Sequence, residues 1–180
     1  VMKVLTGAAE GPLFDISVVL GGVVLADAGL AKDAGEGAAR VAEAIRSGRA
    51  AERFGRMVAA MGGPLGFVDD WSRYLPEAPV IREVPAPKAG HVAAMGGEAL
   101  GLAVVNLGGG RLVESDQVDP AVGIGGLLPL GAKVAKGQPL ARIHASREDK
   151  AEEAAQAVLN AVKITAKPPA VPDLIRERIT

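Results

Sequence analysis

Hydrophobic residues in the first 76 positions recur mainly at helical spacing. Val41 and Ile45 fall on one side of a predicted helix over residues 34–47, and Asp33 stands where an N-cap is expected. A second apolar stripe predicts a helix over residues 50–61, which ends at a Gly-Gly-Pro sequence. Two shorter helical stretches are expected, over residues 1–6 and 68–74.

The segment over residues 13–28 is apolar on nearly every side of the helix that it predicts. Pro12 suits the first turn of this helix, where a missing N–H costs nothing. A helix that is apolar all round must be buried on all sides, and the rest of the chain is too small to bury it. We therefore expect the helix to expose apolar surface when this chain is alone. The chain opens without Met, within helical sequence, and we expect it to be part of a longer protein.

From residue 88 onward the pattern changes to short apolar runs punctuated by glycine and proline. One helical run, over residues 98–107, ends in three glycines, and an amphipathic helix is predicted over residues 145–161. The predicted strands, including a short extended run before residue 88 and an edge strand near the end, are 80–84, 91–94, 121–124, 133–134, 139–144 and 163–167.

These elements predict an α+β fold, in which a layer of helices is followed by a compact module of short strands with one or two helices. Four prolines between residues 76 and 87 favour a boundary there. The expected parts are a helical segment of a larger α/β domain, a Pro-rich connection, the strand-rich module and a tail, over residues 1–76, 77–87, 88–167 and 168–180.

The composition excludes several classes of function. A net charge of −1 and 3% aromatic residues argue against nucleic acid or an anionic membrane surface as a partner. The chain has no cysteine, which excludes disulfides, thiolate metal sites and a cysteine nucleophile and fits a cytoplasmic location. The longest apolar run near the N-terminus, residues 16–28, is too short to cross a bilayer, and no signal-peptide pattern precedes it.

Two glycine-rich stretches imitate anion sites. Residues 126–133 come near a P-loop, but Ala132 stands where that motif requires lysine, and we expect a turn instead. Gly108–Gly110 follow a predicted helix, whereas an anion site places glycines before a helix, so a C-terminal cap is the better interpretation. The adjacent Arg111 is expected to be solvated or ion-paired.

The remaining polar residues form no recognisable constellation. His91 and His144 lie in predicted strands without metal-ligand spacing or a partner nucleophile, and we expect hydrogen-bonded structural histidines. Asp116 and Asp119 lie in turn sequence before Pro120 and are expected to accept bonds from backbone N–H groups. The sequence therefore predicts no catalytic, cofactor-binding or metal-binding residue in this chain.

Residues 131–144 have the shape of a biotinyl or lipoyl carrier hairpin, with a Lys-Gly turn between two strands. Such carriers attach their cofactor to an exposed lysine in a Met-Lys-Met-like turn, and Lys133 and Lys136 lie elsewhere in the pattern. We interpret the similarity as a shared strand architecture without the shared function.

Taken together, short motifs along the whole chain resemble the thymidine phosphorylase family in its bacterial form, within the wider group of pyrimidine-nucleoside phosphorylases. The matches keep one order with nearly ungapped spacing. They are residues 4–7, 13–15, 30–33, 55–60, 63–64, 74–76, 98–105, 107–111, 116, 119, 122–123, 139–145 and 175–180.

This resemblance implies a pentosyltransferase that converts thymidine and phosphate to thymine and 2-deoxyribose 1-phosphate in nucleoside salvage, without an organic cofactor. It implies a homodimer whose subunits have a small helical domain and a large α/β domain with a C-terminal α/β-hammerhead module. The family's phosphate-binding and pyrimidine-binding residues match no position here and lie upstream of Val1. We therefore expect a C-terminal portion that is inactive alone and has the missing N-terminal part of the enzyme as its partner.

A second interpretation, from a different class, is a stand-alone binding or scaffold module that resembles a carrier sandwich without the attachment lysine.

Overall fold

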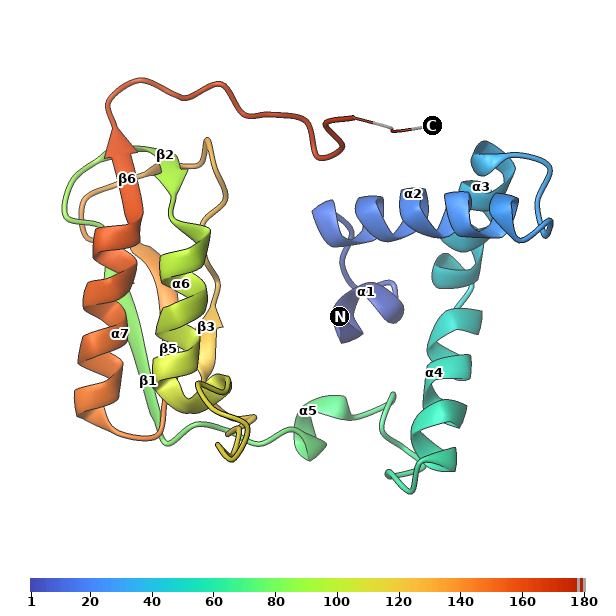
Figure 1. Ribbon diagram of the computed structural model, residues 1–180, viewed down its shortest axis with the longest axis horizontal. Coiled ribbons are helices and arrows are strands. Elements are labelled where there is room, and N and C mark those ends of the chain that lie inside the picture. The colour runs from blue at the N-terminus through green and yellow to red at the C-terminus, as the bar shows by residue number, and fades with distance from the viewer. Residues whose placement is uncertain (178, 180) are drawn as a thin grey trace. The chain divides into compact units, whose positions relative to one another are not determined.

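The computed structural model describes residues 1–177 and 179, and the chain divides into two compact units, each described here by itself. The first unit comprises Val1–Tyr74 with the tail that begins at Pro172, and the second comprises Leu75–Val171 (Figure 1). Of the predicted tail, Arg178 and Thr180 lie outside the described residues. Among the described residues no helix is both long enough and apolar enough to span a membrane.

The first unit is helical, as its sequence predicts. The Asp33 carboxylate accepts a hydrogen bond from the Glu36 N–H at 2.8 Å, which confirms the predicted N-cap. Pro12 lies in the first turn of its helix, also as predicted. The helices are α1 (Met2–Leu5), α2 (Pro12–Asp27), α3 (Ala34–Arg46), α4 (Arg49–Ala60) and α5 (Trp71–Tyr74). The last is shorter than predicted, because Phe67 and Asp69 make turn bonds to residues three positions back.

Helices α2 and α3 cross at their glycines. The side of Gly22 faces the α3 backbone so closely that a Cβ atom built there would lie 2.5 Å from the Ala34 carbonyl oxygen and 2.6 Å from the Ala38 nitrogen. Gly37 in turn approaches the Gly22 backbone. Glycine is unfavourable inside a helix by about 1 kcal/mol relative to alanine, so the close contact of the two backbones accounts for its use here.

Among the described residues of the helical unit, the side of α2 that does not contact α3 is exposed. Only Phe14 and Gly22 of α2 are buried, whereas Leu13, Leu20 and Val24 are 46%, 57% and 65% exposed. The three residues lie at positions i, i+7 and i+11 and so share one side of the helix. We call them the α2 apolar face. Their exposure confirms the prediction that this helix presents apolar surface when the chain is alone.

The second unit has two three-stranded antiparallel sheets. Strand order is β1-β5-β3 in the first sheet and β4-β2-β6 in the second. Its helices are α6, which continues into a π-helical turn η1, and α7. The bounds are β1 (Val80–Pro85), β2 (Gly90–Met95), α6 (Gly97–Val104), η1 (Val105–Gly109), β3 (Gly123–Gly125), β4 (Lys133–Val134), β5 (Pro139–Ala145), α7 (Glu148–Ala161) and β6 (Val162–Thr165). This architecture is α+β, as predicted.

Each sheet has its own apolar core. Helix α7 packs on β1 and β5, with α6 beside it, as Figure 1 shows. Val84, Ile143 and Val158 are fully buried between the helices and the first sheet. Ala151 and Ala154 face the sheet from α7, and their small side chains let the helix approach it closely. The second sheet buries a separate cluster, Ala86, Val92, Val134, Leu140 and Ile164.

Several predicted boundaries are corrected. The strand predicted over residues 121–124 begins only at Gly123, because the Ala121 N–H donates to the Asp119 carboxylate in a turn. Ala145 belongs to β5, where it pairs with Val80, so α7 begins later than predicted. The helix predicted over residues 98–107 becomes π-helical after Val104, with Gly108 at a φ of 102°.

The predicted carrier-like hairpin over residues 131–144 is wrong. Its two strands belong to different sheets, since β4 pairs with β2 and β5 pairs with β1 and β3. The turn between them bonds elsewhere: Ala86 donates to the Gln138 carbonyl and accepts from the Gly137 N–H, both at 2.9 Å. The predicted edge strand is confirmed, since β6 lies at one edge of its sheet.

The domain limits predicted from the sequence stay a prediction. The expected Pro-rich connection, residues 77–87, contains β1, which is hydrogen-bonded to β5.

Candidate functional site

The two histidines lie in different sheets. His91 is in β2, where its Nδ1 atom is buried and has no hydrogen-bond partner among the described residues. The expectation of a hydrogen-bonded structural histidine is therefore wrong for that atom. His144 is in β5, opposite Gly123 and Ile81 of the neighbouring strands. The fold therefore does not combine the two imidazoles in one site.

The two aspartates bind backbone, as predicted. Asp116 Oδ2 accepts from the Leu112 and Val113 N–H groups at 3.0 and 3.1 Å. Asp119 Oδ1 accepts from the Ala121 N–H at 2.9 Å. These bonds order the segment between η1 and β3, and they use the carboxylates in the way that turn residues commonly do.

The P-loop-like segment is a pair of turns. Gly126 and Gly131 have φ values of 61° and 82°, and Lys133 begins a strand where a phosphate site would need the first turn of a helix. The prediction of a turn is confirmed. Gly108 likewise has a positive φ where the helical segment ends, which supports its interpretation as a cap.

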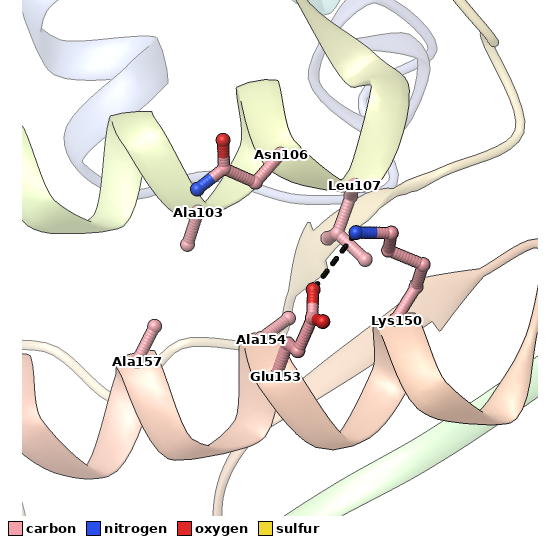
Figure 2. Close-up of a pocket in the computed structure, with 7 residues that line it drawn as sticks. All are labelled: Ala103, Asn106, Leu107, Lys150, Glu153, Ala154 and Ala157. Carbon is pink, nitrogen blue, oxygen red and sulfur yellow. Dashed lines mark hydrogen bonds and ion pairs between the residues drawn. The ribbon is translucent and has the colours of Figure 1, made fainter.

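A small, partly open pocket lies between α6, η1 and α7 (Figure 2). Its volume is about 40 Å³, and Ala103, Asn106, Leu107 and Ala157 contribute to its walls. Lys150 and Glu153 point toward each other at one side and form an ion pair at 2.8 Å (Figure 2). A space of this size holds one or a few water molecules rather than a substrate.

A wider groove of about 470 Å³ follows α4 and the turn segment after it. Its walls include Gly55, Ala59 and Val68, while Glu52 and Arg56 pair with each other at its edge. The groove is large enough for a small ligand, and Asp69 is the third charged residue that lines it. Among the described residues that line it, no nucleophile has a neighbouring base.

A third hollow, of about 170 Å³, lies on the surface of the first sheet. Glu83, Arg142 and His144 line it, above the backbone of Gly125. The sequence alone did not reveal this cluster, because Glu83 and Arg142 are 59 positions apart and meet only through the register of β1 and β5. The alternation of Arg142 and His144 along a predicted strand was the one available signal.

The two carboxyl groups whose pKa is lowered do not line these hollows. The Lys32 N–H, followed by Arg40, lowers the pKa of Glu36, and the Arg147 guanidinium lowers the pKa of Asp149. Both are exposed helix-terminus carboxylates, which such bonds stabilise in the charged form. In the part of the chain that the structure describes, no group of three His, Cys, Asp or Glu residues is arranged to hold a metal ion.

Comparison with known proteins finds a family model and a curated relative that match this chain. Residues 91–165 match the family model described as the pyrimidine nucleoside phosphorylase C-terminal domain. Over 145 residues, or 81% of this chain, the sequence is 45% identical to a thymidine phosphorylase of Agrobacterium fabrum, and the aligned part makes up 33% of that protein. The chain thus spans about a third of the length of this curated relative. The match to the family model identifies residues 91–165 as a pyrimidine nucleoside phosphorylase C-terminal domain.

Proposed function

We propose that this chain is the C-terminal portion of a thymidine phosphorylase. The intact enzyme would convert thymidine and phosphate to thymine and 2-deoxyribose 1-phosphate, a pentosyl transfer of nucleoside salvage. The observation that carries the proposal is the 45% identity over 145 residues to a protein named for this activity. The relative's other two-thirds would supply the residues that bind phosphate and the pyrimidine.

The role of this portion in the enzyme is structural. The helical unit would cover part of the large α/β domain, and the strand-rich unit would be its α/β-hammerhead module. The α2 apolar face supports this role, because Leu20 and Val24 are more than half exposed on a helix without a charged residue between Asp15 and Asp27. Such a surface favours burial against another part of a protein.

The first test is phosphate-dependent release of thymine from thymidine by the purified 180-residue protein. We expect no turnover, because the residues that bind phosphate and the pyrimidine would lie in the other two-thirds of the enzyme. Turnover in a sample whose intact mass matches these residues would contradict the proposed division of labour.

A chimera tests the proposal more directly. This chain would replace the aligned third of the Agrobacterium fabrum enzyme, and we expect a folded chimera with phosphorolytic activity. The same chimera with Leu20→Glu should lose stability and activity, because it places a carboxylate in the buried contact. Leu112→Glu, the same change at a residue that is 71% exposed outside α2, is the matched control. A folded but inactive unsubstituted chimera would refute the proposal.

The homodimer and the cytoplasmic location that the family resemblance implies belong to the same proposal. Sedimentation of the chimera would test the first, and fractionation of cells that express the native protein would test the second. The alternative is a stand-alone scaffold module. It would be supported if the native gene encodes these residues alone and the protein purifies with a different partner.

A further inference from the structure

The hollow on the first sheet follows from the side-chain alternation of three neighbouring strands. Glu83 pairs with Arg142 across β1 and β5, and Gly125 pairs with Arg142 across β3 and β5. Cross-strand partners lie on the same side of a sheet, and His144 joins them because it is two residues from Arg142. Ala141, Ile143 and Ala145 alternate with these residues and are buried on the opposite side. The other side of the sheet therefore presents these polar side chains together with Ile81, which pairs with His144 and is 58% exposed. We call its hollow the β5 trough.

The cationic group of the trough has donor capacity to spare. A guanidinium has five N–H donors, and among the described residues Arg142 uses its side chain in one hydrogen bond, from Nη2 to Glu83 Oε1 at 3.2 Å. Both side chains are 55% exposed, and an ion pair of this kind contributes between about 0 and 1 kcal/mol. An anion can therefore displace Glu83 from Arg142 at low cost.

Glycine at position 125 keeps the trough open, although the fold does not require glycine there. A Cβ atom at Gly125 would lie 3.6 Å from His144 Nε2 and 4.0 Å from the Arg142 carbonyl oxygen, which are ordinary contacts. Its backbone does not have the positive φ of Gly126, which is at 61°. Strands favour β-branched and aromatic residues, so a side chain would fit and would stabilise β3. Its absence leaves the His144 ring edge accessible from the hollow.

We propose that the β5 trough binds a small oxyanion, such as a phosphate or carboxylate group. Arg142 donates two parallel N–H bonds to two oxygens of the anion, the geometry that guanidinium groups favour. The His144 imidazole donates from Nε2 to another oxygen at the Gly125 side. Glu83 competes with the anion for Arg142 and so limits its affinity. Glu83, Gly125, Arg142 and His144 all belong to this chain.

The experiment is a titration of the 180-residue protein with sodium phosphate and with sodium acetate at constant ionic strength and pH. Side-chain NMR signals of Arg142 and His144 are the readout, since they report contact at the trough itself. We expect saturable shifts with phosphate, with a dissociation constant on the order of 1 mM for an exposed site. Stronger binding of phosphate than acetate identifies a phosphate group as the ligand, and the reverse identifies a carboxylate.

Substitutions define the site. Arg142→Gln should weaken binding by about tenfold or more, since a charge-assisted bidentate pair is lost. Glu83→Gln should tighten binding several-fold, because the competing carboxylate is removed. Gly125→Ala should weaken binding without disturbing the fold, which circular dichroism would check. Arg49→Gln, at an exposed ion-paired arginine of α4, is the control and should change nothing.

Absence of saturable shifts with either anion would overturn the proposal. So would equal binding by the unsubstituted protein and Arg142→Gln, which would indicate unspecific association with surface cations. The titration requires no phosphorolytic activity, so its failure is distinguishable from failure of the chimera.

Discussion

The crossing of α2 and α3 gives the sharpest test of how this chain packs. Gly22→Ala adds one methyl group at a buried position in the middle of α2. The added Cβ would lie 2.5 Å from the Ala34 carbonyl oxygen, 2.6 Å from the Ala38 nitrogen and 2.9 Å from the Ala38 Cα. All three atoms belong to the α3 backbone, so no side chain can rotate away. The two helices must separate.

Two opposing terms set the magnitude. Alanine is favoured over glycine inside a helix by about 1 kcal/mol. Overpacking a core typically costs about 1–3 kcal/mol, and the upper end applies here because the obstacle is backbone. The net expectation is a loss of about 2 kcal/mol in the free energy of unfolding of the helical unit.

Gly21→Ala and Gly101→Ala provide a graded comparison. At Gly21 the three atoms nearest to the added Cβ all belong to the Val41 side chain, the first at 2.9 Å, so partial relief by a rotamer change makes the loss smaller. At Gly101 in α6 it would meet nothing within 4 Å, and a gain of about 0.5–1 kcal/mol is expected.

The assay is native-state hydrogen exchange of α2 and α3 amides, which reports the helical unit separately from the sheets. Circular dichroism during urea denaturation provides the overall stability. Equal or greater protection of these amides in Gly22→Ala than in the unsubstituted protein would refute the reasoning, because it would mean that the helices do not meet at Gly22.

Three further substitutions test the acid response and the sheet core. The Lys32 N–H and Arg40 lower the pKa of Glu36 in the folded state. Its carboxylate therefore stabilises α3 above about pH 4.3, where an unfolded glutamate titrates. This stabilisation is lost as the pH falls through the lower pKa of the folded state. Glu36→Gln should therefore reduce stability at pH 7 and flatten its decline below about pH 4.3 in urea titrations at several pH values; an unchanged pH profile would contradict this. Ile143→Ala, at a fully buried residue, should lower the free energy of unfolding by about 2–5 kcal/mol in urea denaturation. Ile81→Ala, at a residue that is 58% exposed, should lower it by less than about 0.5 kcal/mol. Equal losses would contradict the assigned core.

The helices were predictable because their signals are local. Asp33 and Pro12 mark helix starts through their effect on the backbone within three or four residues. The structure places both residues as expected. The π-helical turn after Val104 was not predictable from apolar spacing, since it depends on the bonding of backbone carbonyls near Gly108.

Strand pairing was not predictable, because register depends on residues far apart. The hairpin expected at residues 131–144 failed although its turn was recognised, since Ala86, some fifty positions away, takes the hydrogen bonds of Gly137 and Gln138. The β5 trough escaped notice for the same reason. Neither Glu83 nor Arg142 is informative alone, and their proximity arises only when β1 and β5 pair.

The two units differ in how they are stabilised, and this difference bears on the proposed role of the chain. Every fully buried large side chain among the described residues, from Val84 to Val158, lies in the strand-rich unit, where two sheets and a covering helix enclose their own cores. The helical unit buries Phe14 and Ile45 but leaves Leu20 and Val24 largely exposed. Since burial of apolar area provides most of the folding free energy, the strand-rich unit has the means to hold its structure alone. The helical unit has fewer buried apolar side chains. Another protein surface packed on α2 would bury Leu20 and Val24, as expected of one layer in a larger domain.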